Sequence, residues 1–346
     1  MYRRDSKGGG SMKVDPLAFE GGPFFEAVRD GAHAARSPAA ETLARELAAA
    51  AEGEVLGVVF FGSRRTAAAR ADAHSAHDLF VLVRSYRGFY AALRRAGKTG
   101  KNPWLLAALN VLLPPNQLSL RLGEPVLHAK CSVISLPTFL RETSPARRDH
   151  FCIGRLFQPC QILHHADPET GGRILRALVS AHAETYAWVR PWLPERFDAD
   201  AYGRTALRVS LRREIRPEPE GRAEALWEAQ REEQTPVYTR LLEELAARGE
   251  LRRGDGATYS LARPVTAGER LRLETYFAWS LARATARWLK HMVTFEGWLD
   301  YILRKAARHT GEEIVLTPRE RRLPLLFLWP RLFRYLREKD RPGGRG

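Results

Sequence analysis

The chain has 346 residues, 45% of them hydrophobic, a formal net charge of +15 and three cysteines. This length predicts two or three domains with sizeable cores, and the cysteines Cys131, Cys152 and Cys160 have neither metal-binding spacing nor the pattern of a disulfide framework. A reducing compartment is therefore expected. The positive charge favours an anionic partner, namely nucleic acid, a nucleotide or an anionic lipid surface, although a generally arginine-rich composition explains it equally well.

Membrane-spanning and secretory signals are missing from the sequence. No stretch approaches the ~20 apolar residues that a spanning helix needs, and the longest apolar run near the end, Leu325–Trp329, is followed at once by Pro330. Residues 1–20 are basic but lack the apolar centre of a signal peptide, so we interpret them as a disordered leader. The sequence predicts a soluble or peripheral protein, on the cytoplasmic face of a membrane or, in an organelle, on the matrix face.

The first predicted elements alternate between helix and strand. Residues 37–52 are typical of a helix, with a serine at the N-cap position and a proline in the first turn. The apolar runs 55–61 and 79–83 predict buried strands. Residues 86–96 carry aromatic and aliphatic side chains at helical spacing.

A Gly/Lys-rich hinge at 97–103 separates this part from an apolar helix at 104–113, which ends at a double proline. Residues 117–122 and 126–134 are two further strand candidates. We therefore expect an α/β domain over 21–168, in which helices cover a mixed sheet whose strand order the sequence leaves open.

A second unit is expected at 169–265. A helix over 169–190 opens it, and the charged stretch 213–234 predicts a solvated helix. The following residues read as a helix that stops at Gly249, then a strand, an Asp-Gly turn and a strand. A helix followed by a hairpin is the outline of a winged-helix-like domain, which is a weak signal for nucleic-acid binding.

The C-terminal region 266–339 is predicted to be helical. It combines tryptophan, leucine and phenylalanine with many arginines, in amphipathic patterns. Basic amphipathic helices with aromatic residues bind membrane interfaces, so we expect contact with an anionic membrane here. The alternative is a helix packed on the body of the protein.

The most informative segment runs from Val58 to Val83. A buried strand leads into Gly62-Ser63, a polar crossover follows, and Asp78 stands at the entrance of the next strand. Glycine allows backbone N–H groups to approach phosphates closely, and a carboxylate is a suitable ligand for Mg²⁺. The order of these parts is typical of enzymes that transfer a nucleotide, with Asp78 as catalytic metal ligand and Gly62 and Ser63 as nucleotide-binding residues.

Nucleotidyltransferases commonly carry a second acid two residues from the first, but here that position is Ala76. One strong carboxylate can suffice, because Mg²⁺ keeps water and phosphate ligands. Asp72, Glu124 and Asp149 are the alternatives for a second ligand, and a binding protein without activity is a further alternative.

Two cations complete the candidate site. Lys130 interrupts an apolar strand, where a lysine is costly to bury unless it meets an anion, and it reaches the nucleotide if its strand lies beside 79–83. Arg155 follows an apolar turn and a glycine, and its planar fork suits phosphate. An edge-strand lysine facing water and a structural salt bridge are the respective alternatives. The histidines match no zinc pattern, and neither a Walker A loop nor a Rossmann fingerprint is present.

Three blocks in order give the chain a family resemblance: FFGSRR…SAHDLFVLV, AKCSVISLPTFLRE and FCIGRLFQPCQIL. Over about residues 55–165 the chain resembles the mitochondrial-type CTP:phosphatidate cytidylyltransferases, the translocator-assembly-and-maintenance family. It departs from the family pattern at Arg64, which replaces a glycine, and at Cys131-Ser132, which replace Tyr-Gly.

The resemblance implies a nucleotidyltransferase domain, a winged-helix-like domain and a C-terminal helix at the membrane. It implies that CTP and phosphatidate react with Mg²⁺ to give CDP-diacylglycerol and pyrophosphate, with Gly62, Ser63, Asp78, Lys130 and Arg155 at the site. The alternatives are a nucleotidyltransferase with another acceptor and a non-catalytic nucleic-acid-binding or scaffold protein.

Overall fold

A computed structural model describes residues 16–34, 37–62, 76–123, 126–213, 221–294 and 316–317. Two units divide the chain, Met1–Thr294 and Phe295–Gly346, and the helices and strands described below all belong to the first. Most of the predicted C-terminal region, including the run Leu325–Trp329, lies outside the described residues, as does the crossover at 63–75.

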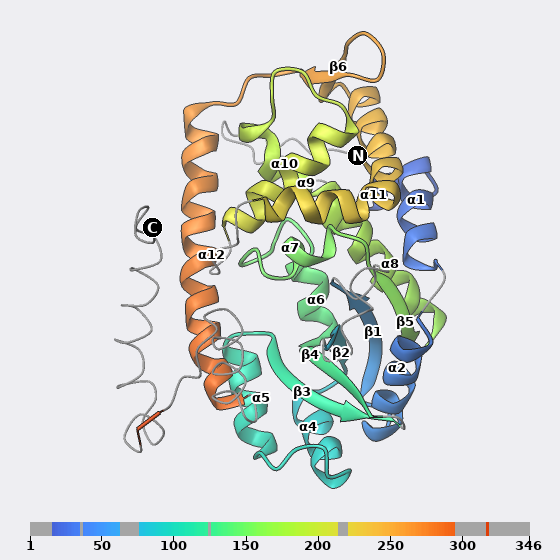
Figure 1. The fold of residues 1–346 in the computed structure, drawn as a ribbon, viewed down its shortest axis with the longest axis vertical. Helices are drawn as coiled ribbons and strands as arrows, with labels where there is room; N and C mark the ends of the chain where they lie inside the picture. Colours follow the sequence, from blue (N-terminus) through green and yellow to red (C-terminus); the bar gives the residue numbers. More distant parts are fainter. Residues whose placement is uncertain are drawn as a thin grey trace, which may run out of the picture. The chain divides into compact units, whose positions relative to one another are not determined.

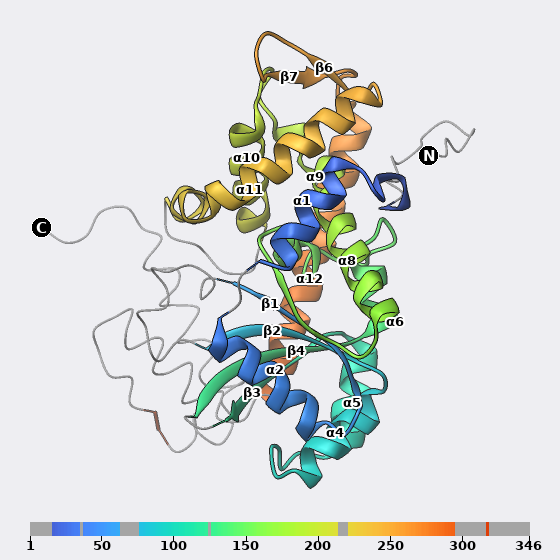
Figure 2. The same cartoon turned by 90° about the vertical axis from the view of Figure 1, so that its right-hand side faces the viewer.

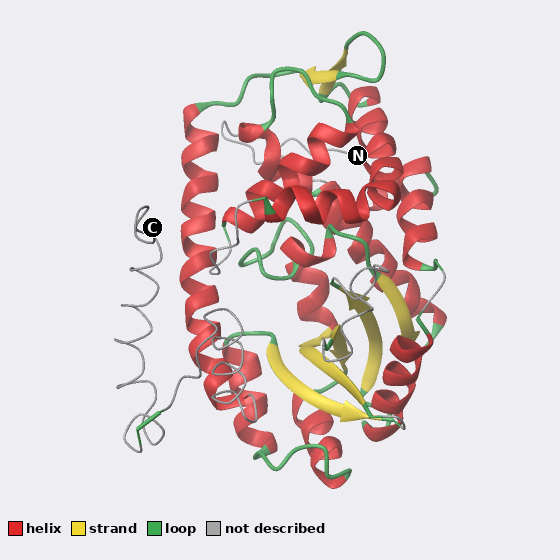
Figure 3. Ribbon diagram, viewed as in Figure 1, coloured by secondary structure: helices red, strands yellow, loops and turns green. Residues whose placement is uncertain are grey.

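The central feature is a mixed sheet, which confirms the predicted α/β class (Figure 3). Within the described residues its order is β3-β4-β2-β1-β5. Only β2 and β4 pair in parallel, and the other neighbours are antiparallel. The strands are β1 (Val55–Phe61), β2 (His77–Val83), β3 (Asn116–Leu122), β4 (Leu127–Ser135) and β5 (Gln161–His165).

Alternation along the strands divides the core into two layers, since successive side chains of a strand point to opposite faces. Leu79 and Val81 pack with residues of three helices on one face, and Phe80 and Leu82 pack with a larger cluster on the other. The first face is covered by α2 (Pro38–Ala50), α4 (Tyr86–Arg95) and α5 (Pro103–Leu112). The second is covered by α1 (Pro23–Ala32), α6 (Leu136–Glu142), α7 (Ile153–Leu156) and α8 (Pro168–Ala183).

Where the structure describes it, the rest of this unit is helical apart from one hairpin. It contains α9 (Thr185–Val189), α10 (Ala199–Arg212), α11 (Arg222–Ala247), β6 (Leu251–Arg253), β7 (Tyr259–Leu261) and α12 (Ala267–Thr294). The predicted stop at Gly249 and the turn at Gly256 are confirmed, and both glycines have positive φ. Figures 1 and 2 show the β6–β7 hairpin at one end of this unit and α4 and α5 at the other.

The expectation of a separate solvated helix at 213–234 is wrong. One helix, α11, runs from Arg222 to Ala247 and continues through Pro236. Trp227, Gln230 and Gln234 are buried on its inner face, against α10 and the larger core. This packing stabilises the helix across the residue that would otherwise end it.

The last described element, α12, runs beside both the sheet part and the helical part of the unit (Figure 1). Near its end Lys290 is buried, and its ammonium group donates to three backbone carbonyls at the end of α5, those of Leu109, Leu113 and Pro115. Arg287 donates to the carbonyl of Pro114 at 3.1 Å. These cations satisfy carbonyl groups that a helix leaves open at its C-terminus.

Among the described helices, none has both the length and the apolar character needed to cross a bilayer.

Candidate functional site

Gly62 and Asp78 lie against each other at the end of β1 and the start of β2. The two strands are antiparallel and Phe61 is opposite Asp78, so that Gly62 follows immediately. Gly62 has a φ of +88°, and a Cβ placed on it would lie 2.8 Å from Oδ2 of Asp78. A side chain is therefore excluded both by the backbone conformation and by the space. The predicted proximity of the glycine turn and the aspartate is confirmed, while Ser63 lies outside the described residues.

Lys130 stands opposite Asp78 on the other side of β2. The parallel register of β2 and β4 pairs the two residues, and Nζ of Lys130 is 3.8 Å from Oδ1 of Asp78. The side chains are 27% and 32% exposed respectively. The condition set by the sequence, that the two strands are neighbours, is met. Because β4 lies between β3 and β2, the alternative of an edge-strand lysine is wrong.

The polar residues cluster where the strands leave the core. Further along the same face, Phe80 and Leu82 are fully buried, so Asp78 occupies the rim of this face. Ser119 of β3 is the register partner of Lys130 and is exposed. We call Gly62, Asp78, Ser119 and Lys130 the rim cluster. Sequence reasoning missed Ser119, whose signal was the alternation of polar and apolar residues in NQLSLRL.

Arg155 of α7 was expected to face a phosphate or to form a salt bridge, and in the structure it packs on an aromatic ring. Its guanidinium lies over the ring of Phe151, 4.0 Å from the centroid, and Nη1 donates to the carbonyl of Phe151 at 2.8 Å. The ring of Phe151 in turn lies 6.3 Å from the ring of Phe80, two residues beyond Asp78. Arg155 is thus linked to β2 through two aromatic rings, on the same face as the rim cluster.

Asp149 is held by two arginines of α12 and is not available as a second metal ligand. Its Oδ2 accepts from Arg283 at 2.7 Å and from Arg287 at 2.6 Å, and its Oδ1 accepts from the backbone of Phe151. The side chain is almost completely buried. Burial opposes ionisation of Asp149, but Arg287 and Arg283 outweigh it and hold the pKa of this carboxyl below its usual range. Asp72 and Glu124 lie outside the described residues.

The described histidines of the sequence-based candidates contact protein groups and do not gather into a metal site. His150 is buried between Ser210, Trp188 and Tyr276. Burial and the nearby Arg147 lower its pKa to about 3, so the ring is neutral at physiological pH. His77 has Nδ1 3.4 Å from the carbonyl of His128. His74 lies outside the described residues.

The donor set of the rim cluster suits a hard cation that brings other ligands with it. In the part of the chain that the structure describes, there is no group of three or more histidine, cysteine or acidic side chains that could hold a metal ion. Asp78 supplies one partly exposed carboxylate. Mg²⁺ binds oxygen, is commonly held by one or two carboxylates, and keeps water and phosphate ligands, so this residue fits such an ion when a phosphorylated ligand accompanies it.

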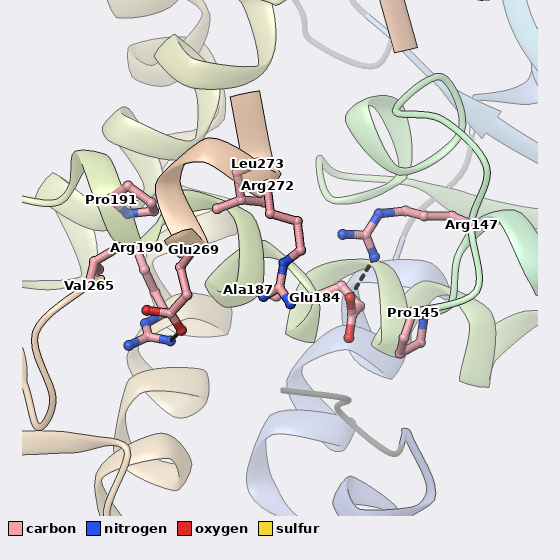
Figure 4. A pocket seen from close by; sticks show the side chains of 10 residues that line it. All are labelled: Pro145, Arg147, Glu184, Ala187, Arg190, Pro191, Val265, Glu269, Arg272 and Leu273. Atoms are coloured by element: carbon pink, nitrogen blue, oxygen red, sulfur yellow. Dashed lines mark hydrogen bonds and ion pairs between the residues drawn. The ribbon is translucent and has the colours of Figure 1, made fainter. Parts of the chain in front are cut away.

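A separate pocket lies between α9, α12 and the loop after α6 (Figure 4). It spans about 580 Å³ including its open mouth. Figure 4 shows Arg147 directed at Glu184 and Arg190 directed at Glu269, and both are ion pairs. The pocket's charges are therefore largely balanced by each other, with Arg272 as an additional cation. None of the residues predicted for the site lines it.

No protein-family model matches the chain, and a search of curated proteins finds no match either.

Proposed function

We propose that this protein is a Mg²⁺-dependent nucleotidyltransferase that transfers CMP from CTP to phosphatidate at a membrane surface. The observation that carries the proposal is the rim cluster: a glycine of positive φ and a lysine both lie against one partly exposed aspartate. The ordered resemblance of residues 55–165 to the phosphatidate cytidylyltransferases supports the choice of nucleotide and acceptor. In this proposal α11 and the β6–β7 hairpin would form the winged-helix-like unit that the resemblance implies.

Each residue of the cluster has a separate role in this proposal. Asp78 would hold Mg²⁺, which when bound supplies charge neutralisation at the triphosphate. Backbone N–H groups at Gly62-Ser63 would donate to phosphate oxygens. Lys130, 3.8 Å from Asp78, carries a positive charge that would turn to a phosphate when one enters. Arg155 would orient the nucleotide or the acceptor phosphate from the same face of the sheet.

The reaction needs positioning more than a strong base. An oxygen of the phosphatidate phosphate attacks the α-phosphorus of CTP and forms the new P–O bond. The bond between this phosphorus and the oxygen that bridges to the β-phosphate breaks, and pyrophosphate leaves with the electron pair. Because the attacking oxygen is already anionic, no side chain has to remove a proton, and the described rim accordingly needs no acid–base pair.

The test is an assay of purified full-length protein with CTP, Mg²⁺ and phosphatidate in mixed micelles, with CDP-diacylglycerol as the product measured. The other three nucleoside triphosphates and other acceptors are assayed in parallel. Turnover with phosphatidate supports the proposal. Turnover with another acceptor only would identify a different nucleotidyltransferase, and no turnover with any triphosphate contradicts catalysis.

The residue assignment is tested with Asp78→Ala and a matched control, Glu46→Gln, which removes an exposed acid on α2. We expect at least a tenfold fall in kcat/KM for the first variant and no change for the second. A smaller loss in Asp78→Ala would reject the metal-binding role. If instead the protein binds nucleic acid, a DNA shift assay should show binding that falls steeply with salt and is independent of Mg²⁺.

A further inference from the structure

Helix α5 is apolar on both of its sides, although only one side faces the core. Leu106 and Asn110 are buried against the sheet layer. On the opposite side Trp104, Leu105, Val111 and Leu112 are 62%, 49%, 68% and 75% exposed. A helix that is apolar all round is normally enclosed by protein or lipid, so the outer side of α5 calls for an occupant.

The exposed residues form one continuous stripe. Positions 104, 105, 108, 111 and 112 recur at the spacing of a single helix face, and Ala108 is exposed as well. Single exposed apolar side chains are ordinary, but a contiguous group of large ones marks an interaction surface. We call these five residues the α5 stripe.

The stretch of chain that contains the stripe has only positive charges of its own, and Glu54 from outside it accepts a hydrogen bond from the backbone N–H of Ser85. Residues 79–123 contain seven lysines and arginines and no aspartate or glutamate. Arg87 of α4 places its guanidinium 3.8 Å from the ring centroid of Trp104. Arg84, Arg94 and Lys98 are exposed on α4 and beside it, whereas Arg95 is paired with Glu52.

This combination selects one kind of partner. Tryptophan and leucine flanked by lysine and arginine bind the interface of a bilayer, where the rings and aliphatic chains enter the lipid and the cations remain at the headgroups. The long uninterrupted positive segment is complementary to anionic headgroups. We propose that the α5 stripe, with the cations of α4 and the α4–α5 connection, docks this protein on an anionic lipid bilayer.

The inference rests on the proposed function, because it names the surface through which such an enzyme meets its membrane. It assigns a membrane contact to residues 84–112, in addition to the C-terminal region favoured by the sequence. The α5 layer covers the face of the sheet opposite to Asp78 and Lys130. Docking through the stripe therefore leaves the rim cluster uncovered by the contact itself, and phosphatidate would have to reach the cluster from the edge of the docked surface.

The experiment is vesicle flotation of the full-length protein. Vesicles contain either phosphatidylcholine alone or phosphatidylcholine mixed with phosphatidylglycerol, an anionic lipid that is not the proposed substrate. We expect binding to the anionic vesicles that weakens as salt is added. In Val111→Asp/Leu112→Asp, we expect at least a tenfold loss of affinity. In Arg94→Gln/Lys98→Gln, we expect the affinity for anionic vesicles to fall about fivefold for each charge removed.

The matched control is Val126→Asp, which changes an apolar residue just before β4 that is 59% exposed and lies outside both the stripe and the C-terminal region. It should bind vesicles like the unchanged protein. Thermal unfolding of every variant checks that the fold is intact, as expected for substitutions of exposed residues.

Equal binding by Val111→Asp/Leu112→Asp and the unchanged protein would overturn the proposal. So would an equal loss in the Val126→Asp control. A stripe variant that alters only the oligomeric state in sedimentation velocity would also overturn it and would assign the stripe to a second copy. Flotation uses no CTP, so its failure is separate from failure of catalysis. A water-soluble short-chain phosphatidate should support the same turnover in the stripe variant and the unchanged protein.

Discussion

Gly62 and Asp78 approach each other so closely that no side chain fits between them. The glycine conformation and the carboxylate position are therefore coupled, although 15 residues of sequence separate them, most of them in a crossover that the structure does not describe. The pair provides a test of the rim cluster that leaves the side chains of Asp78 and Lys130 themselves unchanged.

Gly62→Ala should displace the Asp78 carboxylate. The new Cβ would meet Oδ2 at 2.8 Å, and alanine at a φ of +88° costs about 1 kcal/mol in conformational energy. We expect at least a tenfold fall in kcat/KM for nucleotidyl transfer and a modest fall in Tm.

Gly53→Ala is the control for this prediction. Gly53 has a φ of +81°, but a Cβ there would meet nothing within 4 Å. The stability of Gly53→Ala should fall by about as much as that of Gly62→Ala, while its activity is retained. Equal activities of the two variants would show that the contact with Asp78 is unimportant.

Asp149→Asn should destabilise the protein without acting at the candidate site. Breaking a buried ion pair leaves Arg283 and Arg287 without their counter-charge, which costs about 3–5 kcal/mol. The pKa of Asp149 is lowered in the folded state, so the pair's contribution is present above about pH 4 and is lost as the pH falls through the folded-state pKa. Urea unfolding at pH 7 and at about pH 2.5 should show a smaller variant effect at the lower pH, because the contribution is lost only below the unfolded-state pKa of about 3.9. A loss of activity with unchanged stability would instead support a metal-ligand role.

Lys290→Met should remove a pH dependence of stability. Burial, Arg287 and Arg283 lower the pKa of Lys290 to about 7, while the three carbonyl acceptors oppose that shift. Asp149 is the nearby carboxylate bound to both arginines. Above pH 7 the unfolded chain still binds the proton that the folded protein loses. The free energy of unfolding should therefore rise with pH, by up to about 1.4 kcal/mol per unit.

The measurement for Lys290 is urea unfolding at pH 7, 8 and 9. The difference between the unchanged protein and the methionine variant isolates this group from other titrating residues. At pH 7 the variant should lose about 1–3 kcal/mol, because three carbonyls lose their donor. A constant difference across the three pH values would contradict the prediction.

Gly203→Ala should weaken the contact of α10 with α11. A Cβ on Gly203 would overlap the indole ring of Trp227, which is fully buried and whose Nε1 donates to Asp200 at 2.9 Å. Overpacking of this kind costs about 1–3 kcal/mol. Gly172→Ala in α8 is the matched helical control, because its Cβ would meet only the end of Arg176 at 3.7 Å; it should gain about 0.5–1 kcal/mol. Similar Tm values for the two variants would disprove the packing argument.

Elements with strong local patterns were predictable from the sequence. The strands at 55–61 and 79–83 and the helices at 37–52, 86–96 and 104–113 agree with the structure within a few residues. Strand β5 was missed, because its residues Gln161, His164 and His165 hide the apolar signal and its pairing with β1 is long-range. Pro236 made α11 look like two helices, since a proline removes a helical donor and the compensating packing is tertiary.

The candidate site was predictable only as far as neighbouring strands define it. Asp78 and Gly62 are linked by a simple antiparallel pair, but the contact of Asp78 with Lys130 depends on a parallel pairing whose strand order the sequence does not determine. Asp149 looked like a possible ligand because its partners, Arg283 and Arg287, come 134 and 138 residues later. No local pattern contains that information.

The reach of α12 bears on how the chain acquires its structure during translation. Lys290 donates to carbonyls 175–181 residues earlier, and Arg287 neutralises a carboxylate made long before it. A nascent chain that has emerged only as far as residue 168 would carry Asp149 without its counter-charges and α5 with open carbonyls. We therefore expect the sheet of this protein to reach its final packing only after α12 has left the ribosome. An isolated fragment of residues 21–168 should fold poorly.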